Sequence, residues 1–332
     1  MRTTTIAHTR RHVGVAVGAF SGSGAVTFNT GKATDAGDAP TSDTLFQIGS
    51  VTKLFTALAL ADQVVNRSLS LDTALETVLP GLPLADRSRR ITLRHLASHT
   101  SGLPRLPKGL RRQALRNRTD PYRNFSTGDL LAALTAARPH PEPGSRIRYS
   151  NFGMALLGQI LTLHTGLEYE QLVADRITGP LRMPDTTITM RSEQERRTAI
   201  SHSRPGHPVP DWHLGAMPGA GALRSTVHDL LIFLRAHLDP SSTAIPEALR
   251  LVQQQQARAN RWLQVGLGWH LSPLRGTDHR ALWHNGGTAG SCSYVALVPD
   301  AGVGVVALTN TGRPVDSLGV RLLTRLVQRT TR

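Results

Sequence analysis

A serine and a lysine, Ser50 and Lys53, stand three residues apart where a helical pattern begins. Apolar residues follow from Val51 to Val65 at spacings of three and four, with no glycine or proline among them. A serine in the first helical turn lies near unpaired backbone N–H groups, and a lysine three positions later lies on the same face. Burial of that lysine lowers its pKa, so that its amine can accept the serine proton. The pair predicts a nucleophilic serine with a lysine base.

A simpler interpretation of this pair is a helix-capping serine followed by a surface lysine, since the spacing occurs often by chance. Two observations favour the chemical interpretation. Lys53 is one of three lysines among 38 basic residues, and Leu54 and Phe55 follow it in a strongly apolar helix. A solvated cation at this position would more naturally be an arginine in this chain.

A second candidate group is Tyr149 with Asn151, between a Pro/Gly loop and the apolar helical pattern Phe152–His164. A tyrosine between a serine nucleophile and a lysine can relay a proton to a leaving group. The asparagine amide can orient a substrate carbonyl or hold the lysine. The alternative is a half-buried tyrosine beside a helix-capping asparagine. If these two residues are considered without the other groups, this structural interpretation is the favoured one.

The third candidate group is His284 with Asn285, Gly286 and Gly287, at the end of a predicted strand. Glycines there let a substrate approach the strand edge, and a backbone N–H near Gly287 can contribute to an oxyanion hole. The alternative is a hairpin turn with an incidental histidine. His99 is expected to hold its loop by hydrogen bonds, and no histidines show metal-ligand spacing, so no metal site or organic cofactor is expected.

The surrounding elements predict an α+β fold. Helical patterns cover Leu93–Ser98, Thr127–Ala137, Val227–His237 and Val315–Val327, and strand patterns cover Val265–Leu271, Ala281–His284, Ser293–Val298 and Gly304–Asn310. Two short apolar runs flanking the turn at 21–24 predict a hairpin at the N-terminus. Polar stretches at 105–125 and 240–260 are expected to be surface loops or mobile helices. The pattern predicts an antiparallel sheet built from both ends of the chain, flanked by helices, with an all-α insertion between them.

Composition excludes several other classes of protein. The 332 residues carry a net charge of +15, but the basic residues are scattered and aromatic residues make up only 5%. A nucleic-acid surface would place basic and stacking residues together, so no nucleic-acid partner is expected. The single cysteine, Cys292, excludes an intrachain disulfide framework, and no apolar run is long enough for a membrane span. The glycine-rich run 302–307 lies inside a predicted strand, which argues against a dinucleotide fingerprint.

The N-terminus allows two interpretations. Arg10 and Arg11 before a short apolar run are consistent with a twin-arginine signal, whereas the β-branched residues of that run favour the hairpin. We favour the hairpin and therefore expect a cytoplasmic protein.

Taken together, the three groups resemble the serine β-lactamase and penicillin-binding-protein superfamily, with its S-x-x-K, S/Y-x-N and K-T-G elements. Tyrosine in the second element and histidine in the third resemble the class C β-lactamase-related branch, which includes carboxypeptidases, esterases and acyltransferases. Segments that look like the family's, in its order, are Thr44–Lys53, Leu96–Leu103, Tyr149–Gly153, Gly221–Thr226 and the strand pair 293–310. The resemblance implies one β-lactamase/transpeptidase-like catalytic domain over 1–332. Its sheet subdomain would span about 10–65 and 262–332, and its helical subdomain about 66–261.

The resemblance implies a serine hydrolase that cleaves a small ester, amide or D-amino-acid peptide. Ser50 would be the nucleophile, Lys53 and Tyr149 would share the general-base role, and Asn151 and His284 would orient substrate and tyrosine. The backbone N–H groups of Ser50 and Gly287 would form the oxyanion hole, with Asn285, Gly286 and Gly287 forming the substrate-binding strand edge. The family's third element usually carries hydroxyl side chains where this chain has Asn285 and Gly287. The strand edge therefore lacks the hydroxyl pair that contacts a substrate carboxylate.

Other functions remain open at this point. The same fold serves acyltransferases, D-alanyl-D-alanine carboxypeptidases and β-lactamases, and a catalytically silent relative would bind a peptide or acyl ligand. The intact set of Ser50, Lys53, Tyr149 and Asn151 argues against the silent relative. The sequence does not identify the oligomeric state.

Overall fold

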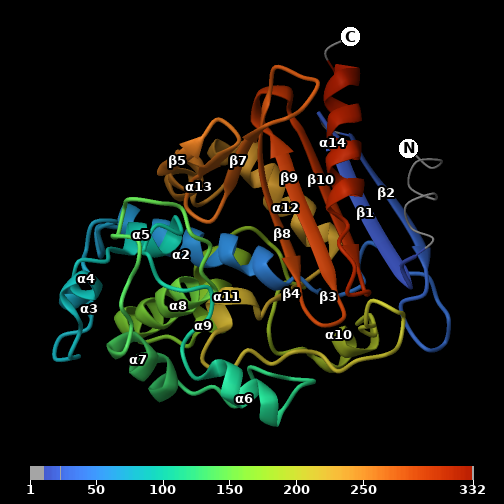
Figure 1. Cartoon of the computed structure of the whole chain (residues 1–332). Coiled ribbons are helices and arrows are strands. Elements are labelled where there is room, and N and C mark those ends of the chain that lie inside the picture. Colours follow the sequence, from blue (N-terminus) through green and yellow to red (C-terminus); the bar gives the residue numbers. More distant parts are fainter. Residues whose placement is uncertain (1–10, 23, 331–332) are drawn as a thin grey trace.

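An eight-stranded antiparallel sheet joins the two ends of the chain in the computed structural model, which describes residues 11–22 and 24–330 (Figure 1). Its strand order is β2-β1-β10-β9-β8-β7-β6-β5. The strands are β1 Gly14–Ser21, β2 Gly24–Gly31, β5 Ala257–Asn260, β6 Leu263–Val265, β7 His270–Pro273, β8 Arg280–Gly287, β9 Cys292–Val298 and β10 Val303–Thr309. A second, two-stranded sheet pairs β3 Phe46–Gln47 with β4 Arg224–Ser225. The predicted α+β fold, with a sheet from both ends of the chain, is confirmed.

Most of the helices lie, in sequence, between the N-terminal strands β1 and β2 and the C-terminal strands β5 to β10. The helices are α2 Thr52–Val65, α3 Leu75–Val78, α4 Asp86–Arg89, α5 Leu93–Ala97, α6 Leu110–Arg116, α7 Thr127–Thr135, α8 Asn151–Thr165, α9 Tyr169–Val173, α10 Ser192–Arg196, α11 Pro218–Gly221, α12 Val227–Leu238, α13 Pro246–Gln253 and α14 Asp316–Thr330. Short 3-10 helices are η1 Gly49–Val51, η3 Pro240–Ser242 and η4 Pro299–Ala301, and η2 Ala174–Thr178 is a short π-helix. No helix within the described residues has the length and apolar character needed to cross a membrane.

The predicted N-terminal hairpin is confirmed by the pairing of β1 with β2, in which Val17 lies opposite Phe28. β1 also pairs with β10, so the hairpin extends the C-terminal strands. Arg10 of the alternative twin-arginine segment lies outside the described residues.

Two sequence predictions were wrong. The run Val265–Leu271 forms two antiparallel strands, β6 and β7, because the chain reverses at Gly266–Gly268 and pairs Val265 with His270. Gly268 has a φ of +74°, a conformation that glycine adopts at little cost. The stretch 240–260 contains α13 and the edge strand β5 rather than loops or mobile helices alone. β5 has no strand pattern in the sequence because most of its residues are polar and exposed.

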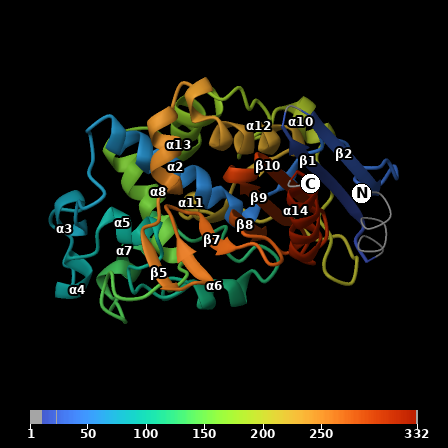
Figure 2. The same ribbon diagram turned by 90° about the horizontal axis from the view of Figure 1, so that it is seen from above.

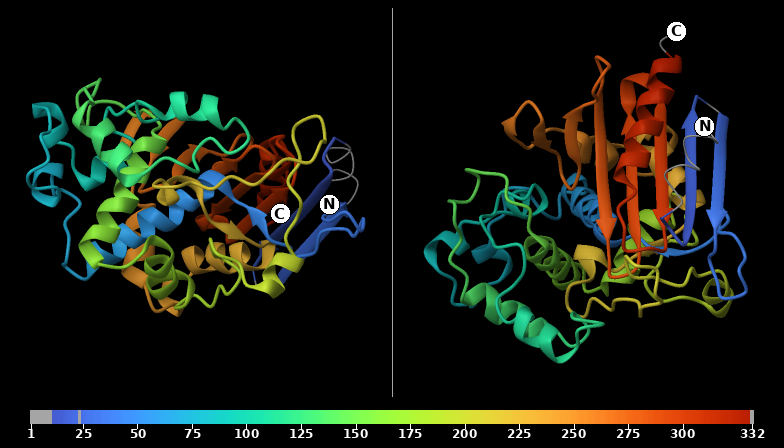
Figure 3. Two further views of the ribbon diagram at one scale, coloured as in Figure 1. Left: turned by 90° about the horizontal axis from the view of Figure 1, so that it is seen from below. Right: turned by 45° about the vertical axis from the view of Figure 1, so that its right-hand side comes forward.

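Helices cover both faces of the sheet. α14 packs on one face, over β9 and β10, and buries Leu318, Leu322 and Leu323 there (Figures 1 and 2). α12 packs on the opposite face, against β1 and β10, and most of the remaining helices extend to one side of the sheet (Figure 3). The sheet therefore forms the middle of three layers. The buried apolar residues form two clusters, and α2 belongs to the larger one.

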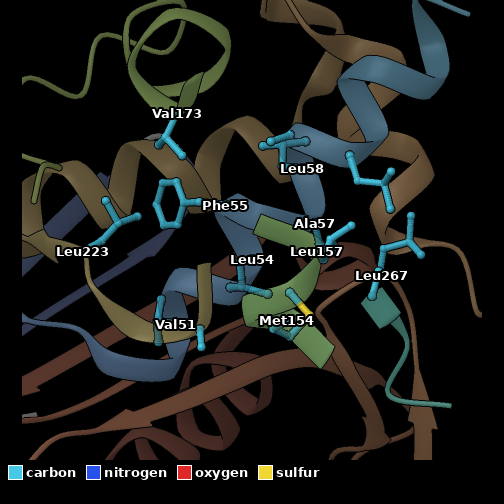
Figure 4. Packing of buried hydrophobic residues seen from close by; sticks show 14 of the residues in the cluster. Val51, Leu54, Phe55, Ala57, Leu58, Met154, Leu157, Val173, Leu223 and Leu267 are labelled. Atoms are coloured by element: carbon cyan, nitrogen blue, oxygen red, sulfur yellow. The ribbon is translucent and has the colours of Figure 1, made fainter. Parts of the chain in front are cut away.

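α2 is buried on all its faces from Thr52 to Gln63. Its side chains Leu54, Phe55 and Leu58 contact residues of several neighbouring helices and loops, as Figure 4 shows. A helix that is apolar all round belongs in a protein interior, which explains the unbroken apolar run in the sequence. Any polar side chain in its first turns is therefore held away from solvent.

The start of α2 is held against strand β8 by glycines. Gly49 has a φ of +50°, and a Cβ atom there would lie 2.7 Å from the Gly287 nitrogen. A Cβ atom on Gly286 would lie 2.0 Å from the Ile48 carbonyl oxygen. That same oxygen accepts a hydrogen bond from Ser293 Oγ of β9 at 2.7 Å. The two glycines therefore set the distance between the turn that bears Ser50 and the strand edge.

The close approach of β8 to this turn predicts the effect of adding one methyl group. Gly286→Ala should lower the free energy of unfolding by about 1–3 kcal/mol, the cost typical of overpacking, because its Cβ collides with backbone. Gly287→Ala is the matched control, since the nearest atom to its Cβ is Cys292 Sγ at 3.7 Å. Urea unfolding followed by circular dichroism measures both variants. Equal stability of the two alanine variants would contradict the close approach.

Candidate active site

Ser50 and Lys53 meet at the start of the buried helix. Ser50 lies in the 3-10 turn η1, and Lys53 is the second residue of α2, one turn further on. Lys53 Nζ lies 2.9 Å from Ser50 Oγ and donates a hydrogen bond to the Ala220 carbonyl oxygen at 2.6 Å. Ala220 belongs to α11, which packs on α2 and α8. The structure thus brings together the first predicted pair.

Burial makes the Lys53 amine unusual. Its side chain is fully buried, and it has no carboxylate partner among the described residues. Removal from water, followed by the positive charge of Arg105, lowers the pKa of Lys53 well below 10.5. The neutral amine is therefore favoured, and a neutral amine has a lone pair that can accept a proton.

Tyr149 lies beside this pair, immediately before α8. Lys53 Nζ is 5.1 Å from the centre of its ring. Burial raises the pKa of the Tyr149 phenol to about 12, although a hydrogen bond with Ser50 and the charge of Arg105 act in the opposite direction. The phenol therefore remains protonated at neutral pH and can donate a proton.

Three histidines surround the Tyr149 ring. Ring-centre distances to Tyr149 are 4.5 Å for His99, 6.2 Å for His284 and 6.3 Å for His270. Burial lowers the pKa of all three, and nearby positive groups lower it further. The rings are therefore uncharged at neutral pH. Within residues 11–22 and 24–330 no three metal-ligating side chains converge on a common point, so these rings form no metal centre.

Hydrogen bonds set the orientation of two of these rings. His284 Nδ1 lies 2.6 Å from the Asn285 carbonyl oxygen, to which the neutral ring donates. His284 Nε2 is then an acceptor without a protein partner. His99 Nδ1 accepts from the backbone N–H of Ser150 at 3.3 Å, as expected for a residue that holds its loop. This bond fixes the position of the segment that carries Tyr149.

A pocket opens in front of Ser50. Gly287 and Asn151 line it next to Ser50, and the Asn151 Oδ1 atom is buried without a protein partner. Tyr122 and Trp212 form an aromatic part of its wall, with ring centres 5.1 Å apart. The pocket combines a hydroxyl, backbone N–H groups and a free amide acceptor with apolar walls. Larger surface hollows elsewhere in the described chain are lined by none of the residues Ser50, Asn151 and Gly287.

The side chain of Asn285 is not part of this assembly, although its carbonyl oxygen orients His284. Successive residues of a strand point to opposite faces, and His284 points towards Tyr149. The exposed Asn285 side chain instead donates a hydrogen bond to Asp316 of α14 at 2.5 Å. The sequence predicts Asn285 at the substrate-binding strand edge, and the structure shows that its side chain instead connects the sheet to α14.

Several residues at the site were not singled out from the sequence. His270 follows the buried Trp269 on β7, and Tyr122 and Trp212 come from irregular segments far apart in the chain. Arg105 lies in the loop between α5 and α6. Its guanidinium carbon is 5.2 Å from the centre of the Tyr149 ring. None of these positions has a spacing that marks it as functional. Only the fold brings them to Tyr149 and Ser50.

Comparisons with known proteins agree with this geometry. A family model described as Beta-lactamase matches residues 3–328. The chain is 31% identical to penicillin-binding protein 4 of Amycolatopsis lactamdurans over 83% of this chain and 74% of that protein. It is 29% identical to the D-alanyl-D-alanine-carboxypeptidase/endopeptidase AmpH of Escherichia coli strain K12, over 80% and 70%. A class C beta lactamase from Rhodobacter sphaeroides has the same fold, with a TM-score of 0.85 at 23% identity over 100% of this chain and 99% of that one.

The tyrosines provide a test of the site's burial. Burial raises the pKa of all four tyrosines of this chain, Tyr122, Tyr149, Tyr169 and Tyr294. Absorbance at 295 nm should therefore show no phenol ionisation centred near pH 10 while circular dichroism reports an intact fold. Tyr149→Phe identifies the contribution of Tyr149. An ionisation step near pH 10 that disappears in Tyr149→Phe would contradict the burial of this phenol.

Proposed function

This chain belongs to the beta-lactamase family of serine hydrolases, and we propose that it hydrolyses an ester or amide through an acyl-enzyme on Ser50. The observation that supports this most directly is the contact between Ser50 Oγ and the fully buried Lys53 amine at 2.9 Å. A serine hydroxyl is a weak nucleophile unless a neighbouring base takes its proton. Lys53 is suited to that role because its lowered pKa favours the neutral form.

Acylation begins when Ser50 Oγ attacks the substrate carbonyl carbon. The Oγ–carbon bond forms as the serine proton moves to Lys53 Nζ. The backbone N–H groups of Ser50 and Gly287 then stabilise the negative oxygen of the tetrahedral intermediate. Both residues line the pocket. The Asn151 amide, with its free Oδ1, orients the substrate by accepting a hydrogen bond.

Tyr149 completes the proton transfer. Its phenol is protonated at neutral pH, so it donates to the leaving group as the bond between the carbonyl carbon and the leaving group breaks. The proton that Lys53 has taken from Ser50 then returns to the phenolate. The neutral His284 and His99 rings hold the tyrosine in place. In this scheme Lys53 acts as the general base and Tyr149 as the general acid, whereas the sequence analysis expects the two residues to share the general-base role.

Deacylation repeats these steps with water as the nucleophile. Water attacks the acyl carbon, its proton follows the same route, and Ser50 is released together with a carboxylic acid. An acyltransferase would use another nucleophile in place of water. The family relatives named as carboxypeptidase/endopeptidase and beta-lactamase place peptide and lactam amides among the substrates to test, together with simple esters.

Replacing the nucleophile tests the proposed function. Ser50→Ala should lose covalent labelling by a fluorescent phosphonate and hydrolysis of nitrophenyl butyrate, because no other hydroxyl in residues 11–22 and 24–330 forms a hydrogen bond with the Lys53 amine. Ser317→Ala, an exposed serine on α14, is the control and should label like the wild type. Mass spectrometry locates the label. An unchanged label on Ser50→Ala would place the nucleophile elsewhere, and an unlabelled wild-type protein would support the silent relative.

Replacing the base separates proton transfer from charge. Lys53→Arg should be nearly as damaging as Lys53→Ala, because arginine keeps the positive charge but does not release its proton near neutral pH. Loss of a general base lowers kcat/KM by about 10²-fold or more. Ester hydrolysis and circular dichroism are measured on both variants. If folded Lys53→Arg retained more than about a tenth of the wild-type rate, the role of Lys53 would be electrostatic only.

A further inference from the structure

An exposed tryptophan and an exposed leucine lie side by side at the turn between β5 and β6, the last two strands at one edge of the sheet. Trp262 is 46% exposed and Leu263 is 36% exposed. Asn260 Oδ1 accepts hydrogen bonds from their backbone N–H groups at 2.8 and 3.0 Å, which closes the turn. Single exposed apolar residues are ordinary on a protein surface. These two form a small apolar patch that the rest of the described chain leaves open to solvent.

Arginines surround this patch. The Arg261 guanidinium carbon lies 4.8 Å from the centre of the Trp262 ring, and that of Arg275 lies 5.6 Å from it. Arg275 belongs to the turn between β7 and β8, so this second turn meets the first one at Trp262. The exposed Arg258 lies on β5. The Trp262 surface is the name used below for Arg258, Arg261, Trp262, Leu263 and Arg275.

The positive charge of the Trp262 surface is not balanced by carboxylates. None of its three arginines forms an ion pair within the described part of the chain. The segments 257–263 and 274–280, which contain the two turns, hold four arginines and one carboxylate, that of the exposed Asp278. An anionic partner that approaches these turns therefore meets an excess of positive charge.

The basic region continues onto the end of α14. A Cβ atom added to Gly276 would lie 3.8 Å from the side chain of Gln328, so the turn between β7 and β8 lies beside the last turn of α14 (Figure 1). That last turn carries the exposed Arg329. Asp316, the acidic residue of this helix, lies at its opposite end. The cations near Trp262 are therefore spread over several elements rather than gathered at one point.

The chemistry of the Trp262 surface indicates the kind of partner. A guanidinium group binds a phosphate through parallel hydrogen bonds. A tryptophan ring combines an apolar body with a polar N–H and is favoured at the boundary between lipid headgroups and acyl chains. Leu263 adds apolar area next to it. We propose that the Trp262 surface binds the protein peripherally to a bilayer that contains anionic phospholipids. This inference concerns where the protein acts, and the proposed hydrolysis does not depend on it.

The same residues fit a nucleic acid less well. Proteins that bind single strands stack successive bases on several aromatic side chains. Between residues 257 and 280 the aromatic residues are Trp262 and Trp269, and Trp269 is buried. Arg261 and Arg275 also lie over the Trp262 ring, where a base would have to stack. A lipid headgroup needs only the guanidinium groups and leaves the ring free to enter the interface.

Binding to vesicles tests the proposal. The wild type should sediment with vesicles that contain phosphatidylglycerol and not with vesicles of phosphatidylcholine alone, and salt should weaken this binding. Replacing the three arginines of the Trp262 surface by glutamine should lower the partition coefficient by about 10²-fold, since each arginine near an anionic surface contributes about fivefold. Trp262→Ala should lower it by about 10-fold, because the apolar ring no longer enters the interface.

Tryptophan fluorescence reports whether Trp262 itself enters the bilayer. The chain has four tryptophans, so Trp262→Phe isolates the signal of this one. Brominated lipids in the phosphatidylglycerol vesicles should quench the wild type, and the quenching should disappear in Trp262→Phe while that variant still sediments with the vesicles. Quenching that is equal in the two proteins would overturn the proposed orientation and with it the proposal.

Helix α6 offers a matched control for charge. It carries three exposed arginines and the exposed Leu115 but no aromatic residue, and it lies on the side of the molecule away from the two turns (Figure 1). Its triple variant, Arg111→Gln with Arg112→Gln and Arg116→Gln, removes the same charge and should bind vesicles like the wild type. An equal fall in this variant would show that binding follows net charge alone and would overturn the proposal.

Two further outcomes would also contradict the proposal. One is a wild type that does not sediment with phosphatidylglycerol vesicles. The other is a single-stranded oligonucleotide that binds the wild type in a gel shift, loses affinity in Trp262→Ala and displaces the protein from vesicles, because the surface would then belong to a nucleic acid. Hydrolysis of nitrophenyl butyrate without vesicles should be the same in the wild type and in these surface variants, since their altered side chains are exposed.

Discussion

The site depends on the burial of one amine. Lys53 lies in the first turn of a helix that is enclosed on every side. Among the described residues its amine contacts one hydroxyl and one carbonyl oxygen but no carboxylate. A charged ammonium without a counter-ion is costly in such a place, so the neutral amine is favoured. The apolar core that makes α2 stable is therefore also what makes Lys53 a base. Stability and chemistry here share one cause.

The same constraint extends outwards from Lys53. Burial also keeps the neighbouring titratable groups neutral, because it lowers the pKa of His99, His270 and His284 and raises that of Tyr149. A protonated phenol next to a neutral amine is the pair of states that a proton relay needs at neutral pH.

Much of the arrangement could be predicted from local sequence. The spacing of Ser50 and Lys53, the unbroken apolar run behind them and the glycines at 286 and 287 each reflect a local requirement: one helical turn, one buried helix and one close approach of backbones. Such requirements leave a pattern within a few residues. The strands of β9 and β10 were predictable for the same reason, because buried strands are continuous apolar runs.

What the sequence could not predict depends on long-range packing. The reversal between β6 and β7 is decided by a glycine turn inside an apolar run, which has no distinctive period. The direction of Asn285 depends on Asp316 of a helix 31 residues later. His270, Arg105 and Trp212 reach the site through three separate segments, and none has a neighbour in sequence that indicates a shared role.

The protonation state of Lys53 is the most direct test of this account. The chain has three lysines, so ¹³C-labelled lysine gives three side-chain signals, and Lys53→Arg identifies the one that belongs to Lys53. The chemical shift of that signal, followed against pH in the folded protein, measures its pKa. The account predicts a midpoint well below 10.5, with the neutral amine favoured where the enzyme is active. A midpoint at or above about 10.5 would show that Lys53 remains a cation when buried, and would contradict its role as the base for Ser50.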